Sequence, residues 1–181
     1  KGSTYLEETW RNSDIVLKDG YVIKDLPVRI EIEQPNVEVK YHGEVKYLDL
    51  KRVDFINYAG NEDNAGLVIK QAEGFTFNEV PLKGLVVLHK GQHYIAVKHF
   101  YIEFLQANYN VAMDVGSRDH RKVKREKLYI AQGNQLVLVK GNEKKIVSKL
   151  GGDKDKAISI IKEHHLNLTQ EKDLYRFVDL L

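Results

Sequence analysis

Three histidines that lie close together in the sequence are the first candidates for metal chemistry. His89, His93 and His99 fall within eleven residues, and imidazole is a common zinc ligand. A hairpin turn at Lys90-Gly91 would pair His89 with Gln92 and put His93 on the opposite face of the sheet. His93 and His99 would share a face but lie roughly 20 Å apart along a strand, too far for one ion to bridge. The spacing therefore predicts surface or edge histidines, with no bound metal and no cofactor.

Motifs for nucleophilic catalysis and for nucleotide binding are absent from the sequence. The chain has five serines, none in a G-x-S-x-G pattern, and it has no Cys. Ser117, Asp119 and His120 are near neighbours, but a catalytic triad needs held geometry and this stretch reads as a loop. No G-x-G-x-x-G or Walker A run occurs. These observations predict a protein that is not an enzyme, although two carboxylates far apart in the sequence would leave no local signature.

A basic tract is the charge feature that could recognise a partner. Residues 118–127 carry six cationic side chains against only Asp119 and Glu126, on a chain with a net charge of +2. Such a tract can contact nucleic acid, anionic lipid or acidic protein. It lacks the interleaved aromatic residues of a single-strand binder, so a solvated loop or exposed strand is the simplest interpretation and protein contact the best functional one. The candidate contact residues are Arg118, Arg121, Lys122, Lys124, Arg125 and Lys127.

Alternating hydrophobicity predicts that most of residues 1–140 form strands. Residues 28–33 and 37–41 alternate apolar and polar side chains, which places one face in a core and one in water. Turn residues separate the apolar runs, as antiparallel hairpins require. The four predicted hairpin turns lie at Asp19-Gly20, His42-Gly43, Lys90-Gly91 and Gly133-Asn134.

The last forty residues change to helical spacing. Asn142, Asp153 and Thr169 are each placed to cap a short helix. Helices this short are marginal alone, so their apolar stripes must pack on the sheet or on one another. We therefore expect an antiparallel β domain over residues 1–140, a meander forming a sandwich or open barrel, with a short helical appendage over residues 141–181. The predicted fold class is mainly β with C-terminal helices (α+β).

Composition supports a folded chain of ordinary size. The sequence is 43% hydrophobic and has only three prolines among 181 residues, which excludes collagen-like and disordered classes. It contains no run of about 18 apolar residues, so no transmembrane helix is predicted. The absence of Cys excludes a disulfide scaffold. The length favours one domain, or one domain with a small appendage.

Several segments resemble an uncharacterised family of exported Bacteroidota proteins. The similar segments include Gly2-Ser3-Thr4-Tyr5-Leu6, Ile15-Val16-Leu17-Lys18-Asp19-Gly20, Pro27-Val28-Arg29-Ile30 and the stretch from Lys149-Leu150-Gly151-Gly152-Asp153 to Asp173-Leu174. The resemblance covers nearly the whole chain. The chain departs from the family in two places. It has His164-His165-Leu166-Asn167 where such proteins tend to be lysine-rich, and it ends with Val178-Asp179-Leu180-Leu181 where they usually close with Tyr-Asn.

The resemblance implies a location and no activity. It implies the periplasm or the cell surface, beside the outer membrane. The start of the chain without Met fits either a mature exported protein or a chain that was cut short. We therefore expect a non-catalytic accessory protein, a subunit of an outer-membrane-associated complex that binds another protein. The alternatives are a carbohydrate- or cell-wall-binding module, a hydrolase with dispersed carboxylates, and a nucleic-acid binder. The first of these would use exposed aromatic rings as stacking platforms, for example Trp10, Tyr21 or Tyr109.

Overall fold

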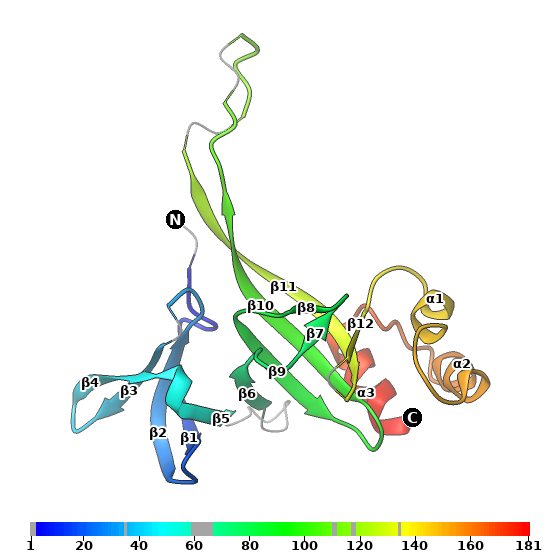
Figure 1. Cartoon of the computed structure of the whole chain (residues 1–181), viewed down its shortest axis with the longest axis horizontal. Coiled ribbons are helices and arrows are strands. Elements are labelled where there is room, and N and C mark those ends of the chain that lie inside the picture. The colour runs from blue at the N-terminus through cyan, green and yellow to red at the C-terminus, as the bar shows by residue number, and fades with distance from the viewer. Residues whose placement is uncertain (1–2, 35, 59–66, 110–111, 117–118, 134) are drawn as a thin grey trace.

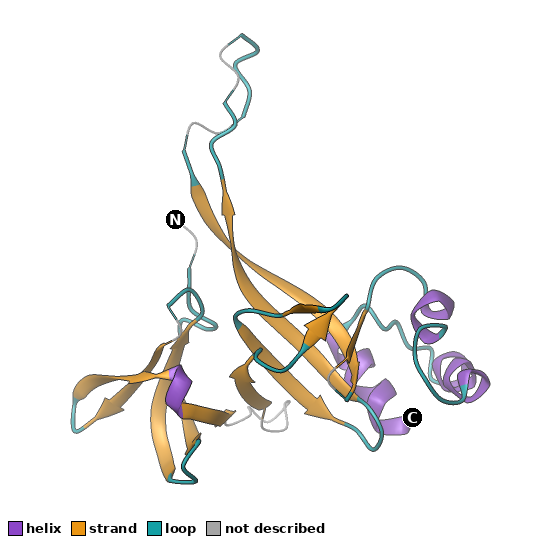
Figure 2. Ribbon diagram, in the orientation of Figure 1, coloured by secondary structure: helices purple, strands orange, loops and turns teal. Residues whose placement is uncertain are grey.

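The computed structural model describes residues 3–34, 36–58, 67–109, 112–116, 119–133 and 135–181. These residues form one open sheet of 12 strands followed by three short helices, so the predicted α+β class is confirmed (Figures 1 and 2). The strands are β1 (Arg11–Leu17), β2 (Val22–Glu31), β3 (Asn36–Tyr41), β4 (Glu44–Asp49), β5 (Val53–Tyr58), β6 (Leu67–Gln71), β7 (Thr76–Phe77), β8 (Val80–Pro81), β9 (Leu85–Lys90), β10 (Ile95–Leu105), β11 (Arg121–Gln132) and β12 (Gln135–Leu138). A 3₁₀ helix, η1 (Leu50–Arg52), precedes β5, and the α-helices are α1 (Glu143–Val147), α2 (Lys154–Glu163) and α3 (Glu171–Leu180).

Most neighbours in the sheet are neighbours in the sequence. The strand order is β4-β3-β2-β1-β5-β6-β9-β10-β11-β12-β7-β8. All pairings are antiparallel except the short parallel contact between β12 and β7. The meander is interrupted twice, because β1 pairs with β5 and because β7 and β8 lie beyond β12.

Three of the four predicted turns join paired strands at the expected place. Asp19-Gly20 joins β1 to β2, His42-Gly43 joins β3 to β4, and the turn after Gln132 joins β11 to β12. Gly20 has a φ of 87°, which glycine adopts without the penalty that a side chain brings. Asn134 itself lies outside the described residues.

The third turn is longer than its sequence suggests. Lys90 pairs with Ile95 and His89 with Ala96, so the predicted pairing of His89 with Gln92 is wrong. The Gly91 amide donates to the Tyr94 carbonyl at 2.9 Å, which defines a four-residue turn. Tyr94 is buried, and its hydroxyl donates to the Gly151 carbonyl beyond α1. This tertiary anchor holds Tyr94 in the turn, where local sequence predicted a strand residue.

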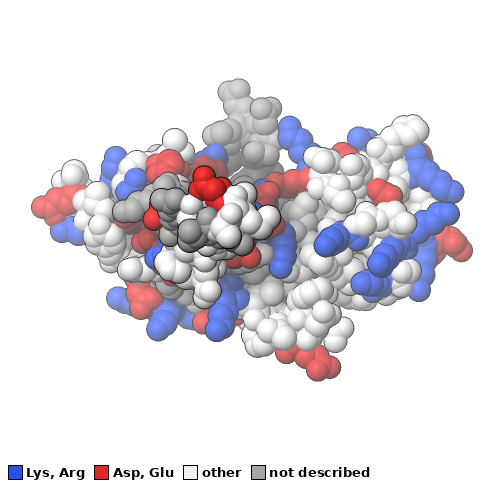
Figure 3. Space-filling view, turned by 90° about the horizontal axis from the view of Figure 1, so that it is seen from above, with Lys and Arg blue, Asp and Glu red and all other residues white. Residues whose placement is uncertain are grey.

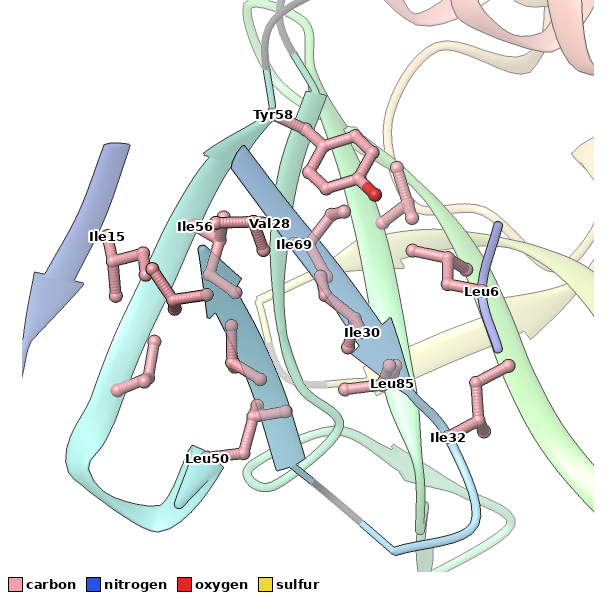
Figure 4. Packing of buried hydrophobic residues seen from close by; sticks show 14 of the residues in the cluster. Leu6, Ile15, Val28, Ile30, Ile32, Leu50, Ile56, Tyr58, Ile69 and Leu85 are labelled. Carbon is pink, nitrogen blue, oxygen red and sulfur yellow. The ribbon is translucent and has the colours of Figure 1, made fainter. Parts of the chain in front are cut away.

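The first core lies inside the curled half of the sheet (Figure 4). Strands β1 to β6, with β9 and part of β10, turn one face toward one another, so that side chains from distant strands meet. Fully buried members include Val28 and Ile30 of β2, Ile56 of β5 and Ile69 of β6. The N-terminal segment closes this core, since the Leu6 amide donates to the Ile30 carbonyl at 2.8 Å and Leu6 is buried.

The second core joins the helices to β10, β11 and β12. Ala96 and Ile130 of the sheet pack with Leu174, Phe177 and Val178 of α3, all of them almost completely buried. Burial of such an apolar stripe supplies the stability that a ten-residue helix lacks on its own. The opposite face of the same strands carries a third core, which includes Val97, Tyr129 and Phe75.

Two of the three predicted helix caps are confirmed. The side chain of Asn142 accepts from the Lys145 amide, and that of Asp153 accepts from the Asp155 and Lys156 amides. The Thr169 cap is wrong: Gln170 occupies the N-cap of α3 without a side-chain cap bond. The side-chain oxygen of Asn167 instead accepts from both the amide and the hydroxyl of Thr169. These two hydrogen bonds to Asn167 hold Thr169 in the turn before the helix.

Candidate functional site

The basic tract lies on a two-stranded arm that extends beyond the rest of the sheet (Figure 1). Strand β10 pairs with β9 only as far as Phe100, and with β11 as far as Leu105. We define the arm as residues 101–105 and 121–127. Five of the six predicted contact residues lie on its β11 strand, and Arg118 lies outside the described residues. Residues opposite each other in an antiparallel pair share a face, so the register divides the tract into two sets.

The inner face of the arm is held by the N-terminal segment. The Lys124 ammonium donates to the carbonyls of Tyr5 and Leu6, each at 3.0 Å, and Lys122 forms an ion pair with Glu33. Lys122 and Lys124 pair with Phe104 and Ile102, so all four side chains share this face. Two of the predicted contact residues therefore fasten the arm to its own chain.

The outer face of the arm carries the other cations. Arg121, Arg125 and Lys127 are all exposed and alternate along β11, so they share one face. The Arg125 guanidinium donates to the Glu103 carboxylate at 2.7 Å, and the Lys127 ammonium lies 5.0 Å from the centre of the Tyr101 ring. The hydrogen bond to the Tyr101 hydroxyl raises the pKa of Lys127, and burial opposes this increase. The outer face thus presents three cations with one carboxylate beside an aromatic ring.

The cationic side chains of the protein are not confined to the arm. Figure 3 shows Lys and Arg also gathered at the end of the molecule formed by α1 and α2. Lys149 and Lys162 are exposed examples there. The arm differs from this helical end because its cations alternate on one strand, next to an unpaired strand edge.

The three clustered histidines are separated in the structure. The His89 Nε2 atom lies 2.8 Å from an oxygen of the Asp179 carboxylate, and the ring of His89 stacks on Tyr175 of α3. His93 is exposed in the turn, as predicted for a surface histidine. His99 is buried rather than at the surface, with its Nε2 atom 2.6 Å from the Lys83 carbonyl. Across the described residues, no group of three or more His, Asp or Glu side chains is arranged to hold a metal ion.

His120 has a structural position near the end of the arm. Its ring stacks on Phe104 at a centroid distance of 5.4 Å, and its Nδ1 atom accepts from the Ala107 amide at 3.1 Å. Ser117, the nucleophile of the weak triad, lies outside the described residues. The histidine of that triad therefore already serves to hold the two sides of the arm together.

A pocket that the sequence does not reveal lies where the N-terminal segment, the sheet and α3 meet. This seam pocket has a volume of about 310 Å³. Its polar residues come from the N-terminal segment, β5, β10, β11 and α3, and its apolar residues come from the N-terminal segment, β6, β9 and β10. The lining residues are Leu6, Glu7, Tyr58, Leu67, Ile69, Val87, Lys98, Phe100, Lys124, Glu126 and Glu171.

Lys98 is the centre of the charged side of the seam pocket. Its ammonium lies 2.6 Å from a Glu171 oxygen and 3.2 Å from a Glu126 oxygen. Burial alone would lower the pKa of Lys98, but the hydrogen bonds and charges of Glu171 and Glu126 outweigh it and raise the pKa. Glu171 also accepts from the Tyr175 hydroxyl at 2.7 Å. The two carboxylates are thus close together and share one cation.

Tyr58 supplies a further polar group that lines the pocket. The residue is only 1% exposed, and its hydroxyl has no hydrogen-bond partner among the described residues. Burial, with a contribution from the Glu7 carboxylate and opposed by Arg11, raises the pKa of this hydroxyl to about 12. The side chain points from β5 toward the side on which Leu6 lies (Figure 4). A buried donor without a partner costs free energy, so it marks a position where a ligand or water can be bound.

Comparisons with known proteins identify no relative. No protein-family model, curated protein or solved structure matches this chain. In the described part of the chain, no helix has the length and apolar character needed to cross a membrane.

Proposed function

We propose that this chain is a non-catalytic accessory protein that binds an acidic partner protein through the outer face and the open edge of its arm. The observation that carries the proposal is the alternation of Arg121, Arg125 and Lys127 on an exposed strand that projects from the sheet. Three cations on one face attract an acidic surface and discriminate against a basic one.

The open edge of β11 adds a backbone contribution. Among the described residues, β12 pairs with β11 only from Tyr129 to Gln132. The Leu128 carbonyl accepts from the Val139 amide on that side. Because backbone groups alternate sides along a strand, those of Lys122, Lys124 and Glu126 face the same edge and are open to a partner strand. An extended acidic segment could therefore add as a strand there, with its side chains beside the outer cations.

An isolated two-stranded ribbon is marginally stable in water. The arm compensates through inner-face contacts such as the bonds from Lys124 to the Tyr5 and Leu6 carbonyls. Its outer face and edge carry no comparable tertiary anchor among the described residues. A partner strand on the open edge would complete a three-stranded unit, which gives the arm a physical reason to associate.

Location and complex membership enter the proposal through the sequence resemblance. We place the protein in the periplasm or at the cell surface, as a subunit of an outer-membrane-associated complex.

The alternative, a carbohydrate-binding module, has weaker support at the three aromatic rings named in the sequence analysis. Trp10 packs against the cations of Arg29 and Lys40, at 4.8 and 4.4 Å from its ring, and the Tyr109 hydroxyl donates to Asp114. Of those three rings, only Tyr21, 67% exposed, is well presented.

The hydrolase alternative requires a pocket with two close carboxylates, and the seam pocket has them in Glu126 and Glu171. However, the Lys98 ammonium lies between Glu126 and Glu171, in the space that an attacking water or a scissile bond would need. The arrangement therefore favours binding over hydrolysis. Nucleic-acid binding through the outer face would be strongly salt-dependent and indifferent to acidic proteins.

A capture experiment with charge-reversed variants tests the proposal. Tagged wild-type protein and the Arg121→Glu/Arg125→Glu variant are incubated with gently solubilised native membranes, and the bound proteins are identified by mass spectrometry. We expect a stoichiometric acidic partner whose retention falls by about tenfold or more in the variant, because like charges then face each other. The matched control is Lys149→Glu/Lys162→Glu at the helical end, which should retain the partner. Recovery of the wild-type protein alone, or equal retention by both variants, would contradict the proposal.

A further inference from the structure

We infer that the seam pocket binds a small neutral ligand that carries several hydroxyl groups and one apolar face, such as a single sugar unit. This inference does not depend on the outer face of the arm, although Lys124 and Glu126 of the arm's inner face line the pocket. It rests on the size of the pocket, on its balance of charges, and on the mixture of donors and acceptors that line it.

The size of the pocket suits one small ligand. A volume of about 310 Å³ is far larger than the share of one water molecule, about 30 Å³. It lies at the lower end of the range for ligand pockets, about 300 to 1,000 Å³. A single sugar ring fits this range, whereas an oligosaccharide would extend into solvent.

The charges that line the pocket cancel. The Glu7 carboxylate is paired with Arg11 at 2.5 Å, and Lys98 lies against Glu126 and Glu171. Lys124 also lines the pocket, so the three glutamates there are matched by Arg11, Lys98 and Lys124. A ligand with a net charge would therefore unbalance the site, because a carboxylate would face three glutamates and an amine would compete with Lys98. A neutral ligand avoids both costs.

The polar groups that remain available are both donors and acceptors. The Tyr58 hydroxyl lacks a described partner, the Lys98 ammonium has three donors, and Glu126 is 61% exposed at its side chain. A ligand hydroxyl both donates and accepts, so adjacent hydroxyls can bond to a carboxylate, an ammonium and a phenol in turn. An apolar ligand would leave these groups unpaired, which is costly. Hydroxyl groups are therefore the ligand groups that can bond to the carboxylate, the ammonium and the phenol together.

The apolar wall completes the match. Phe100, Val87 and Ile69 are buried and line the pocket beside the charged groups, with the Lys98 ammonium 5.2 Å from the centre of the Phe100 ring. The C–H face of a sugar ring can pack on such a wall while its hydroxyls reach the glutamates and Lys98. One apolar face with polar groups on the rim is the general composition of small-molecule sites.

Ligand-observed saturation-transfer NMR tests this inference. The probes are the methyl glycosides of glucose, galactose and N-acetylglucosamine, with hexanoate and hexylammonium as charged comparators of similar size. Each is used at about 20 mM, which detects dissociation constants in the millimolar range. We expect at least one glycoside to bind to the wild-type protein and neither charged probe to compete with it.

Two variants and two matched controls locate the binding. Tyr58→Phe and Glu126→Gln each remove one hydrogen-bonding group from the pocket and should weaken glycoside binding by about fivefold or more. Tyr129→Phe changes a buried tyrosine on the opposite sheet face, and Glu103→Gln changes a carboxylate on the outer face of the arm. Both controls should bind as the wild type does. The inference is overturned if no glycoside binds, if a charged probe binds in preference, or if Tyr58→Phe and Glu126→Gln leave the affinity unchanged.

Discussion

Gly91 and Val178 touch backbone to backbone, with no room for a side chain between them. A Cβ atom on Gly91 would lie 2.0 Å from the Val178 carbonyl oxygen. The turn between β9 and β10 therefore meets α3 at a position that only glycine allows. The contact is reinforced nearby, where His89 stacks on Tyr175 and lies 2.8 Å from the Asp179 carboxylate.

Substitution of Gly91 should loosen α3 from the sheet. We expect Gly91→Ala to lower the free energy of unfolding by about 2 to 3 kcal/mol, because either the turn or the helix must shift to relieve the overlap. Chemical denaturation with circular dichroism measures the loss. The control is Gly20→Ala, where a Cβ meets nothing within 4 Å but φ is 87°, so only the backbone penalty of about 1 to 2 kcal/mol applies. Equal losses in both variants would argue against a close packing role for Gly91.

Features set by a few neighbouring residues were predictable from the sequence. The turn at Asp19-Gly20 and the caps at Asn142 and Asp153 formed as expected, since each depends on one residue and its adjacent backbone. The Thr169 cap failed because α3 begins one residue later, with Gln170 at the N-cap, and the Thr169 hydroxyl is directed to Asn167 in the preceding turn. The buried position of His99 also escaped prediction, because its Lys83 partner comes from another strand connection.

The seam pocket could not be predicted from local spacing. Lys98 and Glu171 are 73 residues apart, and they meet only because α3 docks on β10. In the sequence, Glu126 is one of two acidic residues within the basic tract, and nothing nearby indicates that it pairs with Lys98. The division of the basic tract into inner and outer cations follows from the alternation of side chains along a strand. The sequence would therefore predict it once residues 121–127 are assigned to a strand.

The phenol of Tyr58 should make the protein sensitive to alkali. Its pKa is raised to about 12 from 10.0 by burial, so the folded state keeps the proton to higher pH than the unfolded chain. The contribution of Tyr58 to stability is therefore complete below pH 10 and falls as the pH rises from about 10 to about 12. The total loss is about 2 to 3 kcal/mol. Urea denaturation between these pH values should show a smaller loss for Tyr58→Phe than for the wild type.

Tyr58→Phe should also leave stability at neutral pH unchanged or improve it, because it removes a buried hydroxyl that lacks a described partner. Tyr21→Phe is the control, since Tyr21 is 67% exposed and its removal should not change the alkaline slope. Identical pH slopes in the wild type and Tyr58→Phe would show that this phenol has the same pKa in the folded and the unfolded state, and would contradict the prediction.

His99 should make the protein sensitive to mild acid. Burial, reinforced by the charge of Lys127 and opposed by the bond to the Lys83 carbonyl, lowers the pKa of His99 below 6.5. As the pH falls through 6.5, the unfolded chain binds a proton before the folded state does, so stability present above that pH is progressively lost. Thermal unfolding between pH 8 and pH 5 should reveal a decline in melting temperature.

A variant without a titratable ring isolates this effect. His99→Gln keeps a side-chain donor for the Lys83 carbonyl, and its stability should change less between pH 8 and pH 5 than that of the wild type. His93→Gln removes an exposed histidine and should retain the wild-type dependence. If His99→Gln loses as much stability with acid as the wild type, another group is responsible.

Lys98 should stabilise the docking of α3 as well as the charge balance of the seam pocket. In Lys98→Met, Glu126 and Glu171 would lie close together without their shared cation, and Glu171 would hold Tyr175 less firmly. We expect a loss of about 2 kcal/mol, less than for a fully buried pair because the Glu126 side chain is 61% exposed. Lys98→Arg keeps the charge and should lose less. A double-mutant cycle with Glu171→Gln measures the coupling directly: removing the carboxylate first should make Lys98→Met less costly. A cycle that closes with no coupling energy would mean that Lys98 acts only through the packing of its alkyl chain on the pocket wall.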